Sequence, residues 1–159
     1  MSCLTDSVLT VRGGYHVAAE PHAMVLARGD PVRVSGTELA VRITQHYRIV
    51  EASGPRGPWK VSTAAYWYSL EQLDEWSEII AFHWHPAGRT AITTPHLHLG
   101  PAAHVGRGEL ARAHIPTSRV AIEDFVWLLI QEFGARPQRD DWADVLDAAQ
   151  ETFNEWRTW

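Results

Sequence analysis

The sequence predicts an α+β domain, in which an antiparallel β-meander of about four to six strands precedes two C-terminal amphipathic helices packed on one face of the sheet. Three observations predict it. Stretches in the first two thirds are rich in β-branched and aromatic residues with alternating polar positions. Short, turn-rich connections separate them, as in a meander. The last third changes to a helical period. The length of 159 residues suits a single domain, residues 1–159.

The strands follow in order along the chain. A short strand is expected at residues 7–12, closed by two glycines. Residues 15–31 are ambiguous. Residues 1–31 are expected to form a loosely attached N-terminal segment, which either folds onto the sheet or extends to a partner. The longer strands are expected at residues 37–51, 59–70, 76–85 and 95–99.

Two helices follow. The first has an apolar stripe at helical spacing, made up of Ile122, Phe125, Val126, Leu129, Ile130 and Phe133. Glu123 and Asp124 lie in its first turn, where the helix dipole favours acidic residues, and Gly134 suits its C-terminal end. The second helix begins near Asp140 or Asp141 and has its own stripe of apolar residues from Trp142 to Trp156.

Composition limits the location and the partners. Cys3 is the only cysteine, so no intramolecular disulfide can form, which favours a reducing compartment. No apolar run approaches the roughly 20 residues of a transmembrane helix. The first residues lack the pattern of a signal peptide. We therefore expect a cytoplasmic protein with no membrane association.

The charge is uneven along the chain. The net charge is −5, yet residues 83–119 contain four arginines against one glutamate, together with six of the nine histidines. A local positive field attracts anions even on an acidic protein. The acidic residues 120–159 argue against non-specific binding to duplex nucleic acid, which needs a broad basic face.

Two His-x-His pairs are the feature that most directly suggests chemistry. They are His83-Trp84-His85 and His96-Leu97-His98, each in a predicted strand. Side chains at i and i+2 of a strand share a face, so each pair points to one side. If the strands form a hairpin with His85 opposite His96 and His83 opposite His98, all four imidazoles share one patch, with facing Cβ atoms roughly 5 Å apart.

One interpretation of this patch is a phosphodiester-cleaving site without a metal. His96 and His98 would form the acid/base pair, and His83 and His85 would shape or share the site. Arg89 would hold the phosphate as a bidentate fork. Gly100 would allow a ligand or another backbone to come close. The substrate-binding surface would comprise Thr93, Thr94, Arg107, Arg112, His114 and Arg119.

A second interpretation is a metal site. Neutral imidazole is the commonest ligand for Zn²⁺ and related divalent ions, and three ligands leave an open catalytic position. Metal-bound histidines usually donate their other N–H to a carboxylate or a carbonyl. No Asp or Glu lies between residues 79 and 108 to fill that role. The ligands of such a metal-dependent hydrolase would be His83, His85, His96 and His98.

A third interpretation is a non-catalytic module, in which the same sheet face docks a protein partner. Surface histidines on a solvated strand need no catalytic role. Under this interpretation the imidazoles contribute polar surface to an interface, and neither a cofactor nor a substrate is implied.

The order of these motifs resembles the small TumE-type toxins of bacterial toxin–antitoxin modules. The resemblance rests on Phe82 to His85, on Pro95 to Gly100 and on the helix opening Ala121-Ile122-Glu123-Asp124, and it covers residues 37–134. It implies an RNA-directed toxin with a cognate antitoxin as partner. The chain differs in having an N-terminal extension, a further C-terminal helix and a longer spacer between the histidine pairs. The leading hypothesis is a ribonuclease that acts through the histidine patch.

Overall fold

Two long strands form the centre of the structure. The computed structural model describes residues 1–55, 57–88 and 91–156. Within them, β4 (Leu39–Glu51) pairs with β5 (Trp59–Gln72) along nearly their whole length. Alternating apolar positions on these strands bury one face and leave the other to polar groups. The expected long strands are thus present at the centre of the sheet.

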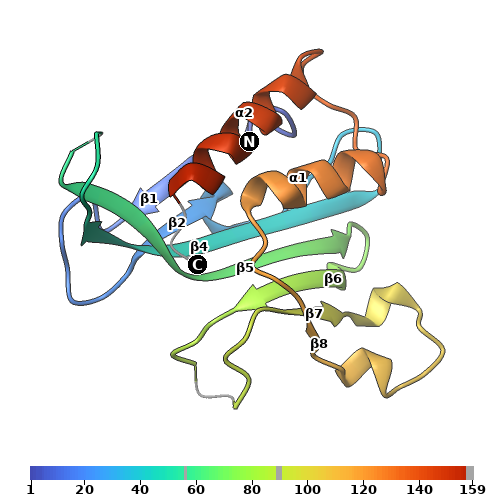
Figure 1. Ribbon diagram of the computed structural model, residues 1–159. Helices are drawn as coiled ribbons and strands as arrows, with labels where there is room; N and C mark the ends of the chain where they lie inside the picture. The colour runs from blue at the N-terminus through green and yellow to red at the C-terminus, as the bar shows by residue number, and fades with distance from the viewer. Residues whose placement is uncertain (56, 89–90, 157–159) are drawn as a thin grey trace.

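Three further strands extend the sheet beyond β5. In order they are β6 (Ser77–Trp84), β7 (His96–Leu99) and the two-residue β8 (Ile115–Pro116), each antiparallel to the one before (Figure 1). The chain from β4 to β8 is therefore a meander, as expected. The described sheet has eight strands, more than the four to six predicted, because several short strands carry too weak a pattern to recognise.

The N-terminal segment lies on the sheet. Strand β1 (Leu9–Arg12) pairs with β2 (His22–Leu26), and β2 pairs with β4. The two-residue β3 (Val32–Arg33) also pairs with β4. Cys3 and Leu4 are each 1% exposed and belong to the hydrophobic core. The first residues of the chain therefore contribute to the folded domain.

The two helices cover one face of the sheet, as predicted (Figure 1). Helix α1 (Ile122–Gln131) buries Phe125 and Leu129 against the strands. The backbone N–H of Ala121 donates to the Asp124 carboxylate at 2.9 Å, which satisfies an amide at the start of the helix. Helix α2 (Trp142–Trp156) lies beside α1 and buries Leu146.

Strand alternation decides which side chains face the helices. On β5, Tyr68 faces α1, with its ring centroid 5.7 Å from that of Phe125. On β6, Phe82 does the same at 6.1 Å. Trp67 and His83, the neighbours of these residues, therefore point to the opposite face of the sheet, where their rings meet at 4.8 Å. His83 therefore lies on the face of the sheet opposite α1 and α2.

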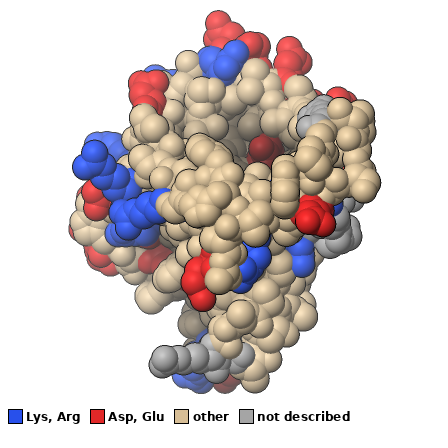
Figure 2. Space-filling model, turned by 90° about the vertical axis from the view of Figure 1, so that its left-hand side faces the viewer, with Lys and Arg blue, Asp and Glu red and all other residues tan. Residues whose placement is uncertain are grey.

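The face that includes the β1 side is of mixed character. Figure 2 views the molecule from the β1 side and shows a largely uncharged surface with scattered acidic and basic side chains. A hollow of about 470 Å³ is lined by exposed apolar residues that include Tyr15, Val17, Trp59 and Val61. Within the described ranges, no helix combines the length and the apolar character needed to cross a membrane.

Candidate functional site

The two His-x-His pairs share one face of the sheet, but their register differs from the expected one. His83 on β6 lies opposite His96 on β7, and His98 lies opposite Ala81. The predicted partners, His85 opposite His96 and His83 opposite His98, are wrong by two residues. A shift by an even number of residues keeps every side chain on its original face. The shared patch is therefore retained, with His85 just beyond the end of β6.

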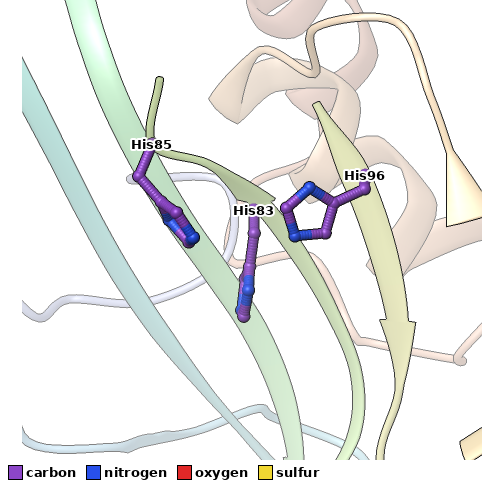
Figure 3. Close-up of side chains that lie close together, drawn as sticks. All are labelled: His83, His85 and His96. Carbon is purple, nitrogen blue, oxygen red and sulfur yellow. The ribbon is translucent and has the colours of Figure 1, made fainter. Parts of the chain in front are cut away.

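The imidazole rings of the two pairs converge. His83 lies with its ring centroid 5.6 Å from that of His85, 5.6 Å from that of His96 and 4.7 Å from that of His98. Figure 3 shows the rings of His83, His85 and His96 extending from β6 and β7 toward a common space. The sheet thus brings together histidines that are separated by up to fifteen positions in the sequence.

His114 is a fifth member of this histidine cluster. It precedes β8, and its ring centroid lies 4.3 Å from that of His98 and 5.0 Å from that of His96. The sequence suggested His114 only as an extension of a substrate surface. Its position follows from the pairing of β8 with β7, and a two-residue strand that contains a proline gives little sequence signal.

Hydrogen bonding leaves ring nitrogens available in the cluster. Nδ1 of His96 donates to the backbone carbonyl of Thr94 at 2.8 Å, so the lone pair of this ring resides on Nε2. Among the residues that the structure describes, Nε2 of His83 is buried and has no hydrogen-bond partner. A buried polar atom without a partner costs about 1–3 kcal/mol, so a bound group that satisfies it would stabilise the site.

The cluster favours neutral imidazoles. Burial, followed by the neighbouring histidines, lowers the pKa of His83 from 6.5 to about 3. Burial also lowers the pKa of His98 and that of His85, with smaller contributions from neighbouring rings. A protonated imidazole would be desolvated and repelled by any second charge. Near neutral pH these three rings therefore offer lone pairs and do not carry charge.

This arrangement predicts that acid destabilises the metal-free protein. His83 has a pKa of about 3 when folded and 6.5 as a free side chain, so the unfolded chain binds the extra proton between these values. The lowered pKa of His83 leaves folding stability unchanged above pH 6.5, and it destabilises the folded state progressively as the pH falls from 6.5 toward 3. We expect the melting temperature of chelator-treated protein, followed by circular dichroism, to fall over this range.

The His83→Gln variant is the control for this pH dependence, because it removes the titrating ring and keeps a polar side chain. Its melting temperature is expected to fall less steeply between pH 6.5 and 4. If the melting temperatures of the wild type and the variant fall with pH in parallel, the lowered pKa of His83 is contradicted.

The other predicted site residues take different positions. Arg119 stacks on Trp84, 3.6 Å from the ring centroid, and Trp84 contacts Tyr66 among the core residues. Arg119 is therefore not brought together with the histidines. Arg107 and Arg112 are exposed on the segment that leads to His114. Arg89 lies outside the described residues.

Two predicted threonines act through their backbone. The carbonyl of Thr94 accepts from His96, and the carbonyl of Thr93 accepts from the indole N–H of Trp84 at 3.2 Å. Both residues are exposed. Their main chain thus positions one histidine of the cluster and anchors the start of β7.

Gly100 allows a close approach of backbone to backbone. Its N–H donates to the carbonyl of Ile79 at 2.9 Å, and a Cβ placed on it would lie 2.0 Å from the carbonyl oxygen of Glu78. Only glycine fits there. Of the two expectations for Gly100, a nearby ligand or a nearby backbone, the structure supplies the backbone.

Sequence reasoning missed a carboxylate, that of Glu78, which contacts a neighbour of the cluster. Glu78 on β6 pairs with Glu71 on β5, outside the interval that the sequence showed to lack acidic residues. Burial, followed by the charge of Glu71, raises the pKa of Glu78, while a hydrogen bond with Trp67 lowers it. Trp67 also contacts His83, so its indole connects the carboxylate to the cluster.

The residues fit a divalent metal ion of the imidazole-binding kind. Two groups each have ligand atoms within 4.8 Å of one another: His83, His85 and His96, and His96, His98 and His114. Zn–N bonds of about 2.0–2.1 Å in a tetrahedral site place the nitrogens about 3.4 Å apart, so the rings must turn inward on binding. The Thr94 carbonyl supplies the outer hydrogen bond that metal-bound histidines usually have.

Comparisons with protein-family models, curated proteins and solved structures gave no match. The resemblance to TumE-type toxins therefore stays a prediction.

Proposed function

We propose that the protein is a metal-dependent hydrolase that acts on phosphodiesters, with RNA as the expected substrate class. Its divalent ion would be held by His83, His85 and His96. The observation that supports this most is the convergence of neutral imidazoles around a buried ring nitrogen without a partner. Three nitrogen ligands of this kind suit Zn²⁺ and its neighbours in the first transition row, and do not suit Mg²⁺ or Ca²⁺.

The metal-free mechanism expected from the sequence is less favourable. A general acid must carry a proton near the working pH. Burial lowers the pKa values of His83, His85 and His98, which removes that proton in the absence of a substrate. The same lowered pKa values favour metal binding, because an imidazole ligand must be deprotonated. The proposal therefore moves the histidines from acid/base roles to ligand roles.

The surroundings suit an anionic substrate. All three ligands are neutral, so the site would keep the full charge of the ion. A divalent ion in such a site lowers the pKa of bound water to about 7 and polarises phosphoryl oxygens. Arg107 and Arg112 are exposed on the segment beside the cluster and would attract the phosphate backbone.

Hydrolysis of bis(p-nitrophenyl) phosphate and of a mixed RNA tests this proposal. We expect turnover by Zn²⁺-loaded or Co²⁺-loaded protein, loss after dialysis against a chelator, and recovery when the ion is returned. His83→Gln is expected to lower kcat/KM by about 10²-fold or more, since it removes a ligand from the reacting centre.

The matched control is His46→Ala, because His46 lies on β4 and is not a member of the cluster. It should hydrolyse both substrates at the wild-type rate. If the loaded protein binds the ion but cleaves neither substrate, the hydrolase proposal fails. If cleavage persists after complete removal of the ion, the metal dependence fails.

A further inference from the structure

The histidine cluster contains a second, outer group of three ligands. His96, His98 and His114 have ligand atoms within 4.8 Å of one another. The ring centroids of His98 and His114 are 4.3 Å apart, which is the shortest separation between two rings of the cluster. His96 is 2% exposed, His98 is half-buried and His114 is exposed. The outer trio therefore extends from the interior of the cluster to solvent.

His96 belongs to both trios, and only one of its nitrogens is available. Its Nδ1 donates to the carbonyl of Thr94, which leaves a single lone pair on Nε2. One lone pair binds one ion. The inner trio with His83 and His85 and the outer trio with His98 and His114 are consequently alternative positions, and His96 cannot complete both at once.

We propose that the outer trio is an entry position, from which a divalent cation passes to the inner trio by exchange of ligands around His96. This inference rests on the proposed metal site. In the transfer the bonds to His98 and His114 break, bonds to His83 and His85 form, and the bond to His96 persists. Each histidine binds the ion as a neutral imidazole, so the exchange of ligands leaves the charge of the ion unchanged and transfers no electron.

Burial gives the direction of this transfer. The inner position contains Nε2 of His83, which is buried and without a hydrogen-bond partner. An ion there satisfies that nitrogen, whereas an ion held by His98 and His114 leaves it unsatisfied. The outer position exchanges readily with solvent because His114 is exposed. The inner position is therefore the tighter of the two, and the outer one is the more accessible.

Titration with Co²⁺ tests this arrangement, since its visible absorption reports the ligand set and calorimetry gives the stoichiometry. The wild type is expected to bind one Co²⁺. His85→Ala disables the inner trio and should still bind one Co²⁺ at the outer trio, with an altered absorption spectrum and a lower affinity than the wild type. The double variant His85→Ala with His114→Ala disables both trios and should bind none.

Stopped-flow mixing with Co²⁺ tests the entry role of His114. His114→Ala should reach nearly the same final spectrum and affinity as the wild type, but should load several-fold more slowly. The matched control is His104→Asn, on the same segment. His104 has a φ of 49°, in the left-handed region that asparagine tolerates, so this variant should fold and load like the wild type.

Each contrary result has a distinct meaning. If His85→Ala binds no Co²⁺ while the wild type does, the outer position is refuted and the inner metal site stands. Two Co²⁺ ions per wild-type chain at the cluster would refute the sharing of His96. Loading of His114→Ala at the wild-type rate would refute the entry role. Absence of binding by the wild type would refute the proposed metal function itself.

Discussion

Replacement of His96 by alanine is expected to abolish Zn²⁺ binding. His96 is the histidine common to both groups of candidate ligands, and its ring is oriented by the Thr94 carbonyl. The expected loss of affinity is greater than the about 10–100-fold typical when an outer hydrogen-bond partner of a ligand is removed. Isothermal calorimetry with Zn²⁺ in a non-chelating buffer measures the effect.

Because His96 is 2% exposed, its removal leaves a space in the structure, and the variant requires a check on folding. His96→Gln retains more of the volume and is expected to lose binding as well. Circular dichroism should show the wild-type sheet content in both variants. Folded His96 variants that bind Zn²⁺ with the wild-type affinity would contradict the assignment of His96 as a ligand.

Zn²⁺ is expected to raise the melting temperature of the wild type. An ion that binds only the folded chain stabilises it by about 2.7 kcal/mol when its free concentration is 100 times Kd. For a domain of this length that corresponds to about 5–10 °C. The physical reason is that the ion connects β6 to β7, which are otherwise held by a ladder of four residue pairs.

Differential scanning calorimetry measures this stabilisation, and a chelator should reverse it. Mg²⁺ at the same concentration is the matched control, since it prefers oxygen ligands and should leave the melting temperature unchanged. The His96→Ala variant should show no shift with either ion. If Zn²⁺ raises the melting temperature of the wild type and of this variant equally, the stabilising ion binds outside the histidine cluster.

The central strands were predictable because their signal is local. Residues 37–51 and 59–70 correspond to β4 and β5, and residues 76–85 and 95–99 to β6 and β7, each with ends within two residues of the expected ones. Both helices follow from their apolar stripes in the same way. The face shared by the two histidine pairs depends only on alternation within each strand, and so it was predictable as well.

The register between β6 and β7 and the positions of the short strands were not predictable from the sequence. The connection between β6 and β7 is long enough to permit several pairings, so the sequence did not determine that His83 faces His96. Strands β3 and β8 have two residues each, and β2 follows a proline in an ambiguous stretch. The position of His114 depends on β8. Contacts that create the cluster thus arise from tertiary pairing and not from local pattern.

The burial of the N-terminal residues was not predictable either, because it also depends on contacts between distant parts of the chain. Cys3 and Leu4 lack any periodic pattern, yet both are in the core, and the backbone carbonyl of Cys3 accepts from the N–H of Gln138 at 2.9 Å. This contact joins residues at opposite ends of the chain. A sequence pattern cannot reveal it, because the energy comes from packing between distant segments.

X-ray absorption at the zinc edge of the loaded protein identifies the atoms bound to the ion. We expect three imidazole nitrogens at about 2.0–2.1 Å from the zinc, together with the more distant scattering of the rings. We also expect this scattering to disappear in the His96→Ala variant. A first shell composed of oxygen ligands alone, with no imidazole scattering in the wild type, would contradict the proposed metal site.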